Sequence, residues 1–168
     1  MIRRVVWADA AQHTAAILEA IAEQRRQHPG AKLNVGGRWA GPKILFTDPA
    51  VADLVAPLRR WLEDELDVDP EKGITGWGLV VETGDVIEKH KHERSAQWGT
   101  NRYAGTYCVT CPPLADGSSR LTAYEADETA RTFDPTPGAA VVFDALTFHE
   151  SAAHREPEPR VMVAFSVA

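Results

Sequence analysis

The sequence predicts an α+β fold in which helices cover one side of an antiparallel β-sandwich. Before residue 70 the chain holds two stretches with helical periodicity, and from Gly73 onward it breaks into short apolar runs separated by turn residues. A length of 168 residues with 44% hydrophobic content suits one core. We therefore expect a single domain, 1–168, with mostly helical support in residues 1–70 and a β core in residues 73–168.

The first expected helix covers residues 10–27. This segment is rich in Ala, Glu, Gln and Leu, which favour helices, and it carries Ile17, Leu18 and Ile21 on one stripe. Pro29 follows directly and cannot continue the helix. We expect an amphipathic helix on the surface of the core.

A second helix is expected after an irregular segment. Residues 32–46 mix glycines with a short apolar run, which suits a strand or hairpin better than a helix. Asp48 is then a typical N-cap residue, and an apolar helical stripe continues to Leu66. Pro57 interrupts this stripe, so the helix must kink or restart there.

The remaining chain reads as strands that alternate with turns. The Gly84-Asp85 pair predicts the first hairpin, and later runs are separated by segments rich in Pro, Gly and Asp. Seven strands are expected, over residues 77–82, 86–92, 103–110, 120–124, 139–143, 147–151 and 160–167.

Charge and hydropathy exclude several classes of partner. A net charge of −6 and a pI near 5.5 argue against a nucleic-acid groove or an anionic membrane surface, because both require a basic field. No segment approaches the ~20 apolar residues of a membrane helix, and polar residues interrupt the N-terminus where a signal peptide would be apolar. We expect a cytoplasmic protein with a small-molecule or protein partner, whose oligomeric state stays open.

The two cysteines, Cys108 and Cys111, have the C-x-x-C spacing of redox pairs and zinc sites. Residues three apart on a strand point to opposite faces, no second C-x-x-C occurs, and no helix signal follows. We therefore expect no functional role for this pair.

A His-x-His sequence is the clearest sign of chemistry. On an expected strand Glu88, His90 and His92 share one face, and the two lysines between them point the other way. Two imidazoles at this spacing can bind one ion, although they do not choose among Fe, Zn, Cu and Ni. The alternative is a polar strand that faces solvent.

His149 and Arg160 extend this set. His149 begins a strand that can face the two histidines across the sandwich, and Arg160 opens the apolar C-terminal strand. A guanidinium at the start of a buried strand requires an anion, and its planar shape suits a carboxylate. The three histidines and Arg160 together can therefore hold a metal ion and a small diacid. The alternative is an arginine at the rim, paired with Glu156 or Glu158.

The order of these motifs resembles a known family. His90-x-His92, then the segment PGAAVVFDALTFHE over residues 137–150, then Arg160, is similar to the double-stranded β-helix of Fe(II)- and 2-oxoglutarate-dependent oxygenases. The resemblance is strongest over residues 76–168. It implies a double-stranded β-helix (a cupin-like jelly roll) with the N-terminal helices packed on one face.

Two further segments resemble small members of this family: the sequence NVGGRW at residues 34–39, and Gly105-Thr106-Tyr107 before the Pro112-Pro113 loop. The resemblance implies an oxidoreductase, a dioxygenase that hydroxylates or desaturates a small molecule with O₂, Fe(II) and 2-oxoglutarate.

For the site, the resemblance implies that His90, His92 and His149 bind iron and that Arg160 binds 2-oxoglutarate. Met162 stands two residues beyond the arginine, where the family often has a small hydroxyl residue, so we expect Tyr107 or Tyr103 to supply a hydroxyl instead.

His92 stands where the family normally has a carboxylate. Three histidines are therefore expected to bind the metal, with Glu88 as an alternative ligand and Glu93 as another if a bulge turns it inward. Three neutral imidazoles would leave a ferrous ion its full charge and favour an anionic co-ligand.

The substrate is expected to contact the segment that follows the metal strand. Arg94, Trp98 and Arg102 lie there, and the two arginines predict an acidic or amino-acid-like substrate.

Two other functions stay open. Gly84, five residues before the His-x-His, resembles the start of a cupin metal motif, which would imply a dioxygenase or isomerase without 2-oxoglutarate. Ala96 and Gln97 occupy the positions of the next cupin ligand and weaken this alternative. The third hypothesis is a non-enzymatic β-sandwich that binds a partner through exposed aromatic residues.

Overall fold

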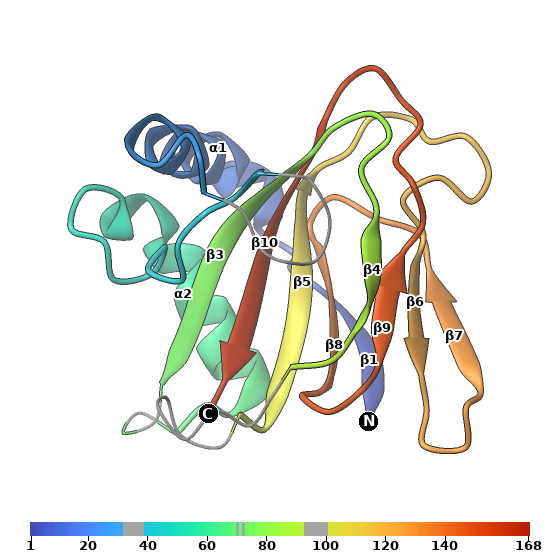
Figure 1. Ribbon diagram of the computed structural model, residues 1–168. Helices are drawn as coiled ribbons and strands as arrows, with labels where there is room; N and C mark the ends of the chain where they lie inside the picture. Colours follow the sequence, from blue (N-terminus) through green and yellow to red (C-terminus); the bar gives the residue numbers. More distant parts are fainter. Residues whose placement is uncertain (32–38, 70, 72, 93–100) are drawn as a thin grey trace.

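The computed structural model describes residues 1–31, 39–69, 71, 73–92 and 101–168 and shows two antiparallel sheets with two helices on one outer face (Figure 1). The elements, in chain order, are β1 (Ile2–Val6), α1 (Ala10–Gln27), β2 (Trp39–Ala40), α2 (Ala52–Leu66), β3 (Ile74–Val81), β4 (Ile87–His90), β5 (Tyr103–Thr110), β6 (Leu121–Tyr124), β7 (Ala130–Phe133), β8 (Ala139–Asp144), β9 (His149–Ser151) and β10 (Arg160–Val167).

The chain winds back and forth between the two sheets. In the described residues the larger sheet has the order β1-β8-β5-β10-β3-β2 and the smaller sheet the order β4-β9-β6-β7. From β3 onward, each connection except the β6–β7 hairpin leads from one sheet to the other. This winding is that of a double-stranded β-helix, so the predicted fold class is confirmed.

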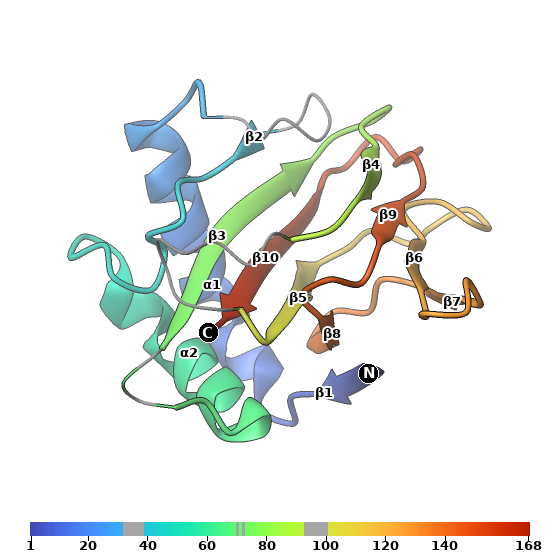
Figure 2. The same ribbon diagram turned by 60° about the horizontal axis from the view of Figure 1, so that its bottom comes forward.

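The helices pack on the outer face of the larger sheet (Figure 2). Strand alternation turns Val163 and Phe165 of β10 toward the helices, where they meet Ile17 of α1 and Leu58 of α2 in one core cluster. All four side chains are fully buried. The opposite face of the same sheet is turned toward the smaller sheet, and the candidate site residues lie between the two sheets.

Both expected helices are present. The first has the expected bounds, and the second continues through Pro57 without a break. Neither α1 nor α2, the helices of the described residues, has the length and apolar content that a membrane-crossing helix requires.

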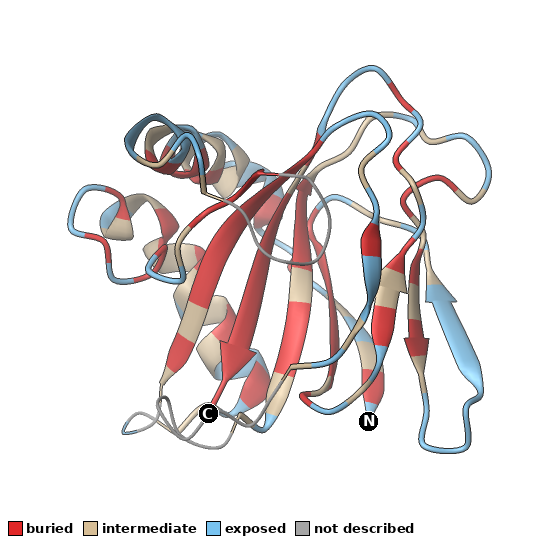
Figure 3. Cartoon of the chain, viewed as in Figure 1, coloured by how far each residue is buried: buried red, intermediate tan, exposed pale blue. Residues whose placement is uncertain are grey.

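All seven expected strands are present. The strands at 103–110 and 160–167 have the expected bounds and the other five are shifted, and the described residues contain three more that the sequence did not predict: β1, β2 and β7. The expected strand over residues 86–92 is shorter, since β4 ends at His90. Strand β7 is mostly exposed, which explains its weak pattern in the sequence (Figure 3). The segment at 34–39 lies outside the described residues except for Trp39.

Candidate metal centre

Strand pairing brings two histidines together. β4 and β9 are antiparallel neighbours in the smaller sheet, and His90 stands directly opposite His149. His92 follows β4 by two residues, and its backbone N–H donates to the carbonyl of Ala145 at 3.0 Å. The three side chains therefore meet at the end of β4.

The three imidazoles form a compact set. The ring centroids are 4.2 Å apart for His90 and His149, 5.2 Å for His92 and His149, and 5.7 Å for His90 and His92. One nitrogen from each ring can be chosen so that all three lie within 4.8 Å of one another. Small side-chain rotations would bring all three nitrogens to a single ion.

Backbone carbonyls fix which nitrogen two of these rings present. The Nδ1 atoms of His90 and His149 lie 2.7 and 3.0 Å from the carbonyl oxygens of Glu88 and Thr147. A carbonyl only accepts a hydrogen bond, so Nδ1 carries the proton in both rings and Nε2 presents its lone pair. Such a bond to the second nitrogen is usual for histidines that bind metals.

Burial keeps two of the rings neutral. Burial, followed by the neighbouring His90, lowers the pKa of His149 to about 3 and that of His92 to about 4. Both rings are therefore uncharged near neutral pH, which is the form that binds a metal.

The structure does not support Glu88 as a ligand. The pairing of β4 with β9 shifts between Ile87 and His90. These two residues are three positions apart on β4, whereas their partners Ser151 and His149 are two positions apart on β9. This irregularity breaks the strict alternation that predicted a shared face, and Glu88 is exposed while Ile87 and His90 both line the cavity. Glu93 lies outside the described residues.

Arg160 is held between the sheets rather than at the rim. It is only 2% exposed, and it donates to the Ser119 carbonyl at 3.1 Å and to Ser151 Oγ at 3.3 Å. Ser151 Oγ also donates to the Ser119 carbonyl at 3.0 Å. These oxygens orient the guanidinium. Glu156, one of the expected rim partners, accepts from Ser118 Oγ and the backbone of Ala115.

A buried histidine supports this arrangement from behind. His154 Nε2 lies 2.7 Å from the carbonyl of Glu158, so it donates there, and Nδ1 forms a hydrogen bond with Ser119 Oγ at 2.8 Å. Ser119 has a φ of 55°, in the left-handed region. This bond secures the strained residue whose carbonyl faces Arg160. The sequence offered no signal for it, because the partners come from two distant loops.

The histidines and Arg160 share one cavity. It encloses about 470 Å³ including its opening to solvent, and Leu79, Thr106 and Met162 are part of its wall. Thr106 is a functional candidate that the sequence reasoning missed, although alternation along β5 could have found it.

The expectation for Tyr107 is not met. Tyr107 lies on the opposite face of β5, fully buried against Trp7 and Trp61 at centroid distances of 6.0 and 5.8 Å. Tyr103 packs on the same helix-facing core. Thr106 points into the cavity, and both tyrosines lie on the other face of β5. Neither phenol therefore reaches the cavity.

The expected substrate residues are only partly described. Arg94 and Trp98 lie outside the described residues. Arg102 stacks on Tyr103, with its guanidinium carbon 5.2 Å from the ring centroid, and it is not part of the cavity wall.

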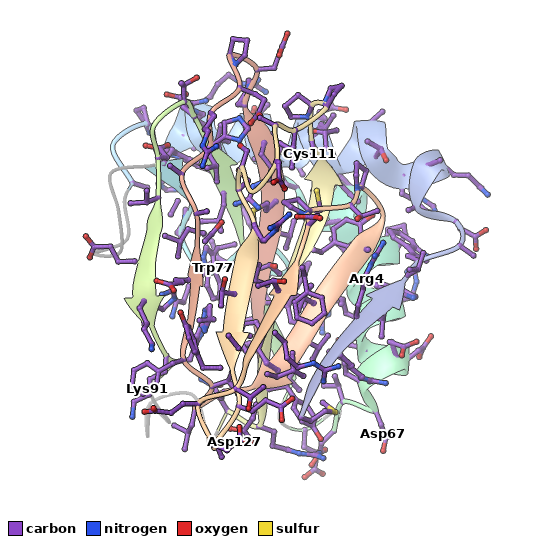
Figure 4. All side chains as sticks on the ribbon, turned by 90° about the vertical axis from the view of Figure 1, so that its right-hand side faces the viewer. Arg4, Asp67, Trp77, Lys91, Cys111 and Asp127 are labelled. Atoms are coloured by element: carbon purple, nitrogen blue, oxygen red, sulfur yellow. The ribbon has the colours of Figure 1, made fainter. Side chains whose placement is uncertain are left out.

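The cysteine thiols are closer than the sequence predicted. A register shift in β5 opposite Val161 and Met162 changes the alternation, and the Cys108 and Cys111 thiols form a hydrogen bond with each other. This bond raises the pKa of Cys108 and lowers that of Cys111, and Arg160 also favours both thiolates. Cys111 is labelled in Figure 4, directly after β5.

Comparisons with known proteins identify the fold. No protein-family model and no curated protein matches the chain. Solved structures match over 99% of it: a prolyl hydroxylase from Trichoplax adhaerens in complex with a peptide fragment (TM-score 0.74, 11% identity, 82% of that chain) and a prolyl-4-hydroxylase from Pseudomonas putida (0.68, 13%, 91%). A non-haem α-ketoglutarate-dependent carbocyclase from nogalamycin biosynthesis also matches (0.74, 12%, 79% of that chain).

These structures share the fold of the present chain at 11–13% identity. The resemblance seen in the sequence is therefore confirmed for the fold, and the function has to be argued from the site itself.

Proposed function

We propose that this protein is a non-haem Fe(II)- and 2-oxoglutarate-dependent dioxygenase that hydroxylates or desaturates a small, acidic or amino-acid-like molecule. The observation that supports this function is that three histidines and a buried arginine line one cavity between two sheets. The proteins named above carry comparable chemistry on the same fold.

The donor set fits a ferrous ion. Imidazole nitrogens suit iron, and the low pKa of His92 and His149 keeps both ready for a metal at neutral pH. Three neutral ligands leave the ion its double positive charge, which favours an anionic co-ligand such as a keto acid. When bound, iron and 2-oxoglutarate supply the activation of O₂ and the oxidation of a C–H bond, with succinate and CO₂ as co-products.

The far end of the cavity fits the second carboxylate of 2-oxoglutarate. Arg160 offers a planar fork whose direction is set by the Ser119 carbonyl and Ser151 Oγ. Leu79 and Met162 line the cavity between Arg160 and the histidines and suit the methylene groups of the diacid, and Thr106 adds a hydroxyl.

The chain's own residues position the reactants and limit the entry of water. Ser166 Oγ lies 3.3 Å from His92 Nδ1 and orients that ring, as the two carbonyls orient His90 and His149. Apolar walls lower the polarity around the ion, which strengthens each electrostatic contact inside the cavity.

Anaerobic titration tests the proposal. Protein loaded with Fe(II) under argon should develop the visible absorption band of an iron–keto acid chelate when 2-oxoglutarate is added. Arg160→Met should weaken 2-oxoglutarate binding by about 100-fold, because a charge-assisted bidentate contact of about 2–3 kcal/mol is lost. Arg120→Met, which removes an arginine paired with Asp116 and Asp134 at the surface, is the matched control.

Two results would contradict the proposal. Protein purified without a tag that holds no metal and does not bind Fe(II) would support the non-enzymatic alternative. Iron binding without the band, together with turnover that is unchanged in Arg160→Met, would support a cupin-type enzyme that binds its substrate directly.

A further inference from the structure

The indole N–H of Trp77 is a buried donor that lacks a partner. Trp77 is 3% exposed, lines the cavity beside the histidines, and its Nε1 has no hydrogen-bond partner in the part of the chain that the structure describes. Leaving such a buried donor unsatisfied destabilises the protein. Indole nitrogen can only donate, so a ligand that satisfies it must offer an acceptor. Trp77 is labelled in Figure 4.

A cation lies over the ring that carries this donor. The segment before α2 runs along the edge of β3, since the backbone amides of Gly41 and Leu45 donate to carbonyls of β3 at 2.8 and 3.0 Å. This places Lys43 beside Trp77, with Nζ 4.8 Å from the ring centroid. The charge of Lys43 also acts on His92, whose ring lies 6.0 Å from that of Trp77.

This pair lies far from Arg160. Trp77 is opposite Ala164 in the β3–β10 ladder, whereas Arg160 is opposite Val81. Four residues of strand separate the two positions, or about 13 Å at about 3.3 Å per residue. A carboxylate held by Arg160 therefore cannot be the acceptor for Trp77.

We propose that Trp77, in the cavity wall, and Lys43, which is exposed and lies over the Trp77 ring, form a second anion-binding subsite that takes the carboxylate of the substrate. Trp77 donates its N–H to one carboxylate oxygen, and Lys43 supplies the positive charge. The inference rests on the proposed function and narrows the substrate class to small carboxylic acids. Because 2-oxoglutarate would engage the metal and Arg160, a second anion needs another cation, and Lys43 lies beside Trp77.

The test compares carboxylic acids with their neutral analogues. The probes are carboxylic acids of three to six carbons, with and without an α-amino group, each paired with its primary amide. Binding to protein loaded with Fe(II) and 2-oxoglutarate under argon is followed by the shift of the visible band, and by ligand-observed NMR on Zn(II)-loaded protein. At least one acid should bind about 10-fold more tightly than its amide, equivalent to one charge-assisted contact.

Variants then locate the preference. Trp77→Phe keeps an aromatic ring without the N–H, and Lys43→Met keeps the length without the charge. Each should reduce the preference for acid over amide by about 5- to 10-fold and change 2-oxoglutarate affinity less than 2-fold. Lys89→Met is the matched control, because Lys89 Nζ also lies over an aromatic ring, 3.7 Å from the Tyr124 centroid, and Tyr124, unlike Trp77, is not part of the cavity wall. If Trp77→Phe does not fold, Lys43→Met decides.

The failures are distinguishable. If the 2-oxoglutarate band forms but no acid binds more tightly than its amide, the subsite is wrong and the proposed function stands. The same conclusion follows if both variants weaken 2-oxoglutarate instead of the acids, since the donor would then serve the co-substrate. If no band forms in the unmodified protein, the proposed function fails and the inference fails with it.

Discussion

Single hydrogen bonds decide how the metal-site histidines present their nitrogens. The carbonyls of Glu88 and Thr147 fix the tautomers of His90 and His149, but His92 is bonded to a hydroxyl, which both donates and accepts. His92 is therefore the ring whose orientation depends on one side chain, Ser166. It is also the ring at the position where the family resemblance leads one to expect a carboxylate.

Removing the Ser166 hydroxyl should weaken metal binding. Ser166→Ala leaves His92 Nδ1 without its partner at 3.3 Å, and loss of such a supporting contact costs about 10- to 100-fold in metal affinity. Chelator competition with Fe(II) or Co(II) measures the change. Thr132→Ala, on the exposed strand β7, should have no effect. Equal metal affinity in Ser166→Ala and the unmodified protein would show that packing alone holds the ring.

The same histidines should make the metal-free protein sensitive to acid. The pKa values of His92 and His149 are lowered from 6.5 to about 4 and about 3, so the unfolded chain binds protons that the folded chain does not. Stability is therefore full above pH 6.5 and falls as the pH drops toward 4. Between pH 7.5 and 5.5 each histidine should cost roughly 1.4 kcal/mol of unfolding free energy.

Urea unfolding of metal-free protein at the two pH values measures this loss. A double variant, His92→Gln with His149→Gln, is the control and should lose little stability over the same interval. A metal-free protein that is equally stable at pH 7.5 and 5.5 would contradict the burial of the two rings.

At the scale of elements, two strand irregularities place functional side chains. The shift in β4 turns Ile87 and His90 to the same side, and the shift in β5 lets the two thiols meet. Strict alternation predicted that His90 and His92 share one face. It also predicted that Glu88 points inward and that the two cysteines point to opposite faces. A bulge adds one residue without a strong sequence signature, so alternation fails beyond it.

The helices could be predicted more closely than the strands. The bounds of α1 follow from its own apolar stripe and the proline after it. By contrast, β7 has three exposed residues of four and exists because it pairs with β6. Strands of this kind depend on partners distant in sequence, which a local pattern does not contain.

The close contact between β5 and β10 gives an element-scale prediction. A Cβ at Gly105 would lie 2.5 Å from the Phe165 ring and 2.6 Å from the Val141 carbonyl, so Gly105→Ala should destabilise the protein by about 1–3 kcal/mol. Gly30→Ala, where no atom lies within 4 Å of the added Cβ, is the control. Thermal unfolding measures both, and equal melting temperatures would mean that β5 and β10 can separate without cost.

At the scale of the whole molecule, the site exists because the two sheets face each other. Strands β4 and β9 of the smaller sheet, with the segment that follows β4, supply the histidines. The larger sheet supplies Arg160 and Thr106. The order of motifs in the sequence predicted the histidines and the arginine as site residues, and the structure brings them to one cavity. It did not point to Trp77 or Ser119, because their roles arise from contacts between segments that are 15 to 41 residues apart.

The loops that close the far end of the sandwich depend on one carboxylate. Glu156, in the segment before β10, accepts from Ser118 Oγ and from the backbone of Ala115, in the segment after β5. The Ser118 bond first, and then the backbone bond, lower the pKa of Glu156 from 4.5 to about 2. The residue after Ser118 is Ser119, whose carbonyl accepts a hydrogen bond from Arg160. Glu156 therefore links the stability of these loops to the orientation of the arginine.

Glu156→Gln should therefore destabilise the protein in a way that depends on pH. The folded pKa is below the unfolded one, so the carboxylate stabilises the fold above pH 4.5, and this contribution disappears as the pH falls toward 2. The variant should unfold at lower urea concentration than the unmodified protein at pH 7, with a difference that shrinks below pH 4.5. Glu158→Gln, at an exposed position nearby, is the control and should match the unmodified protein at both pH values. A difference for Glu156→Gln that stays constant from pH 7 to pH 3 would mean that the shape of the side chain, rather than its charge, holds the two loops together.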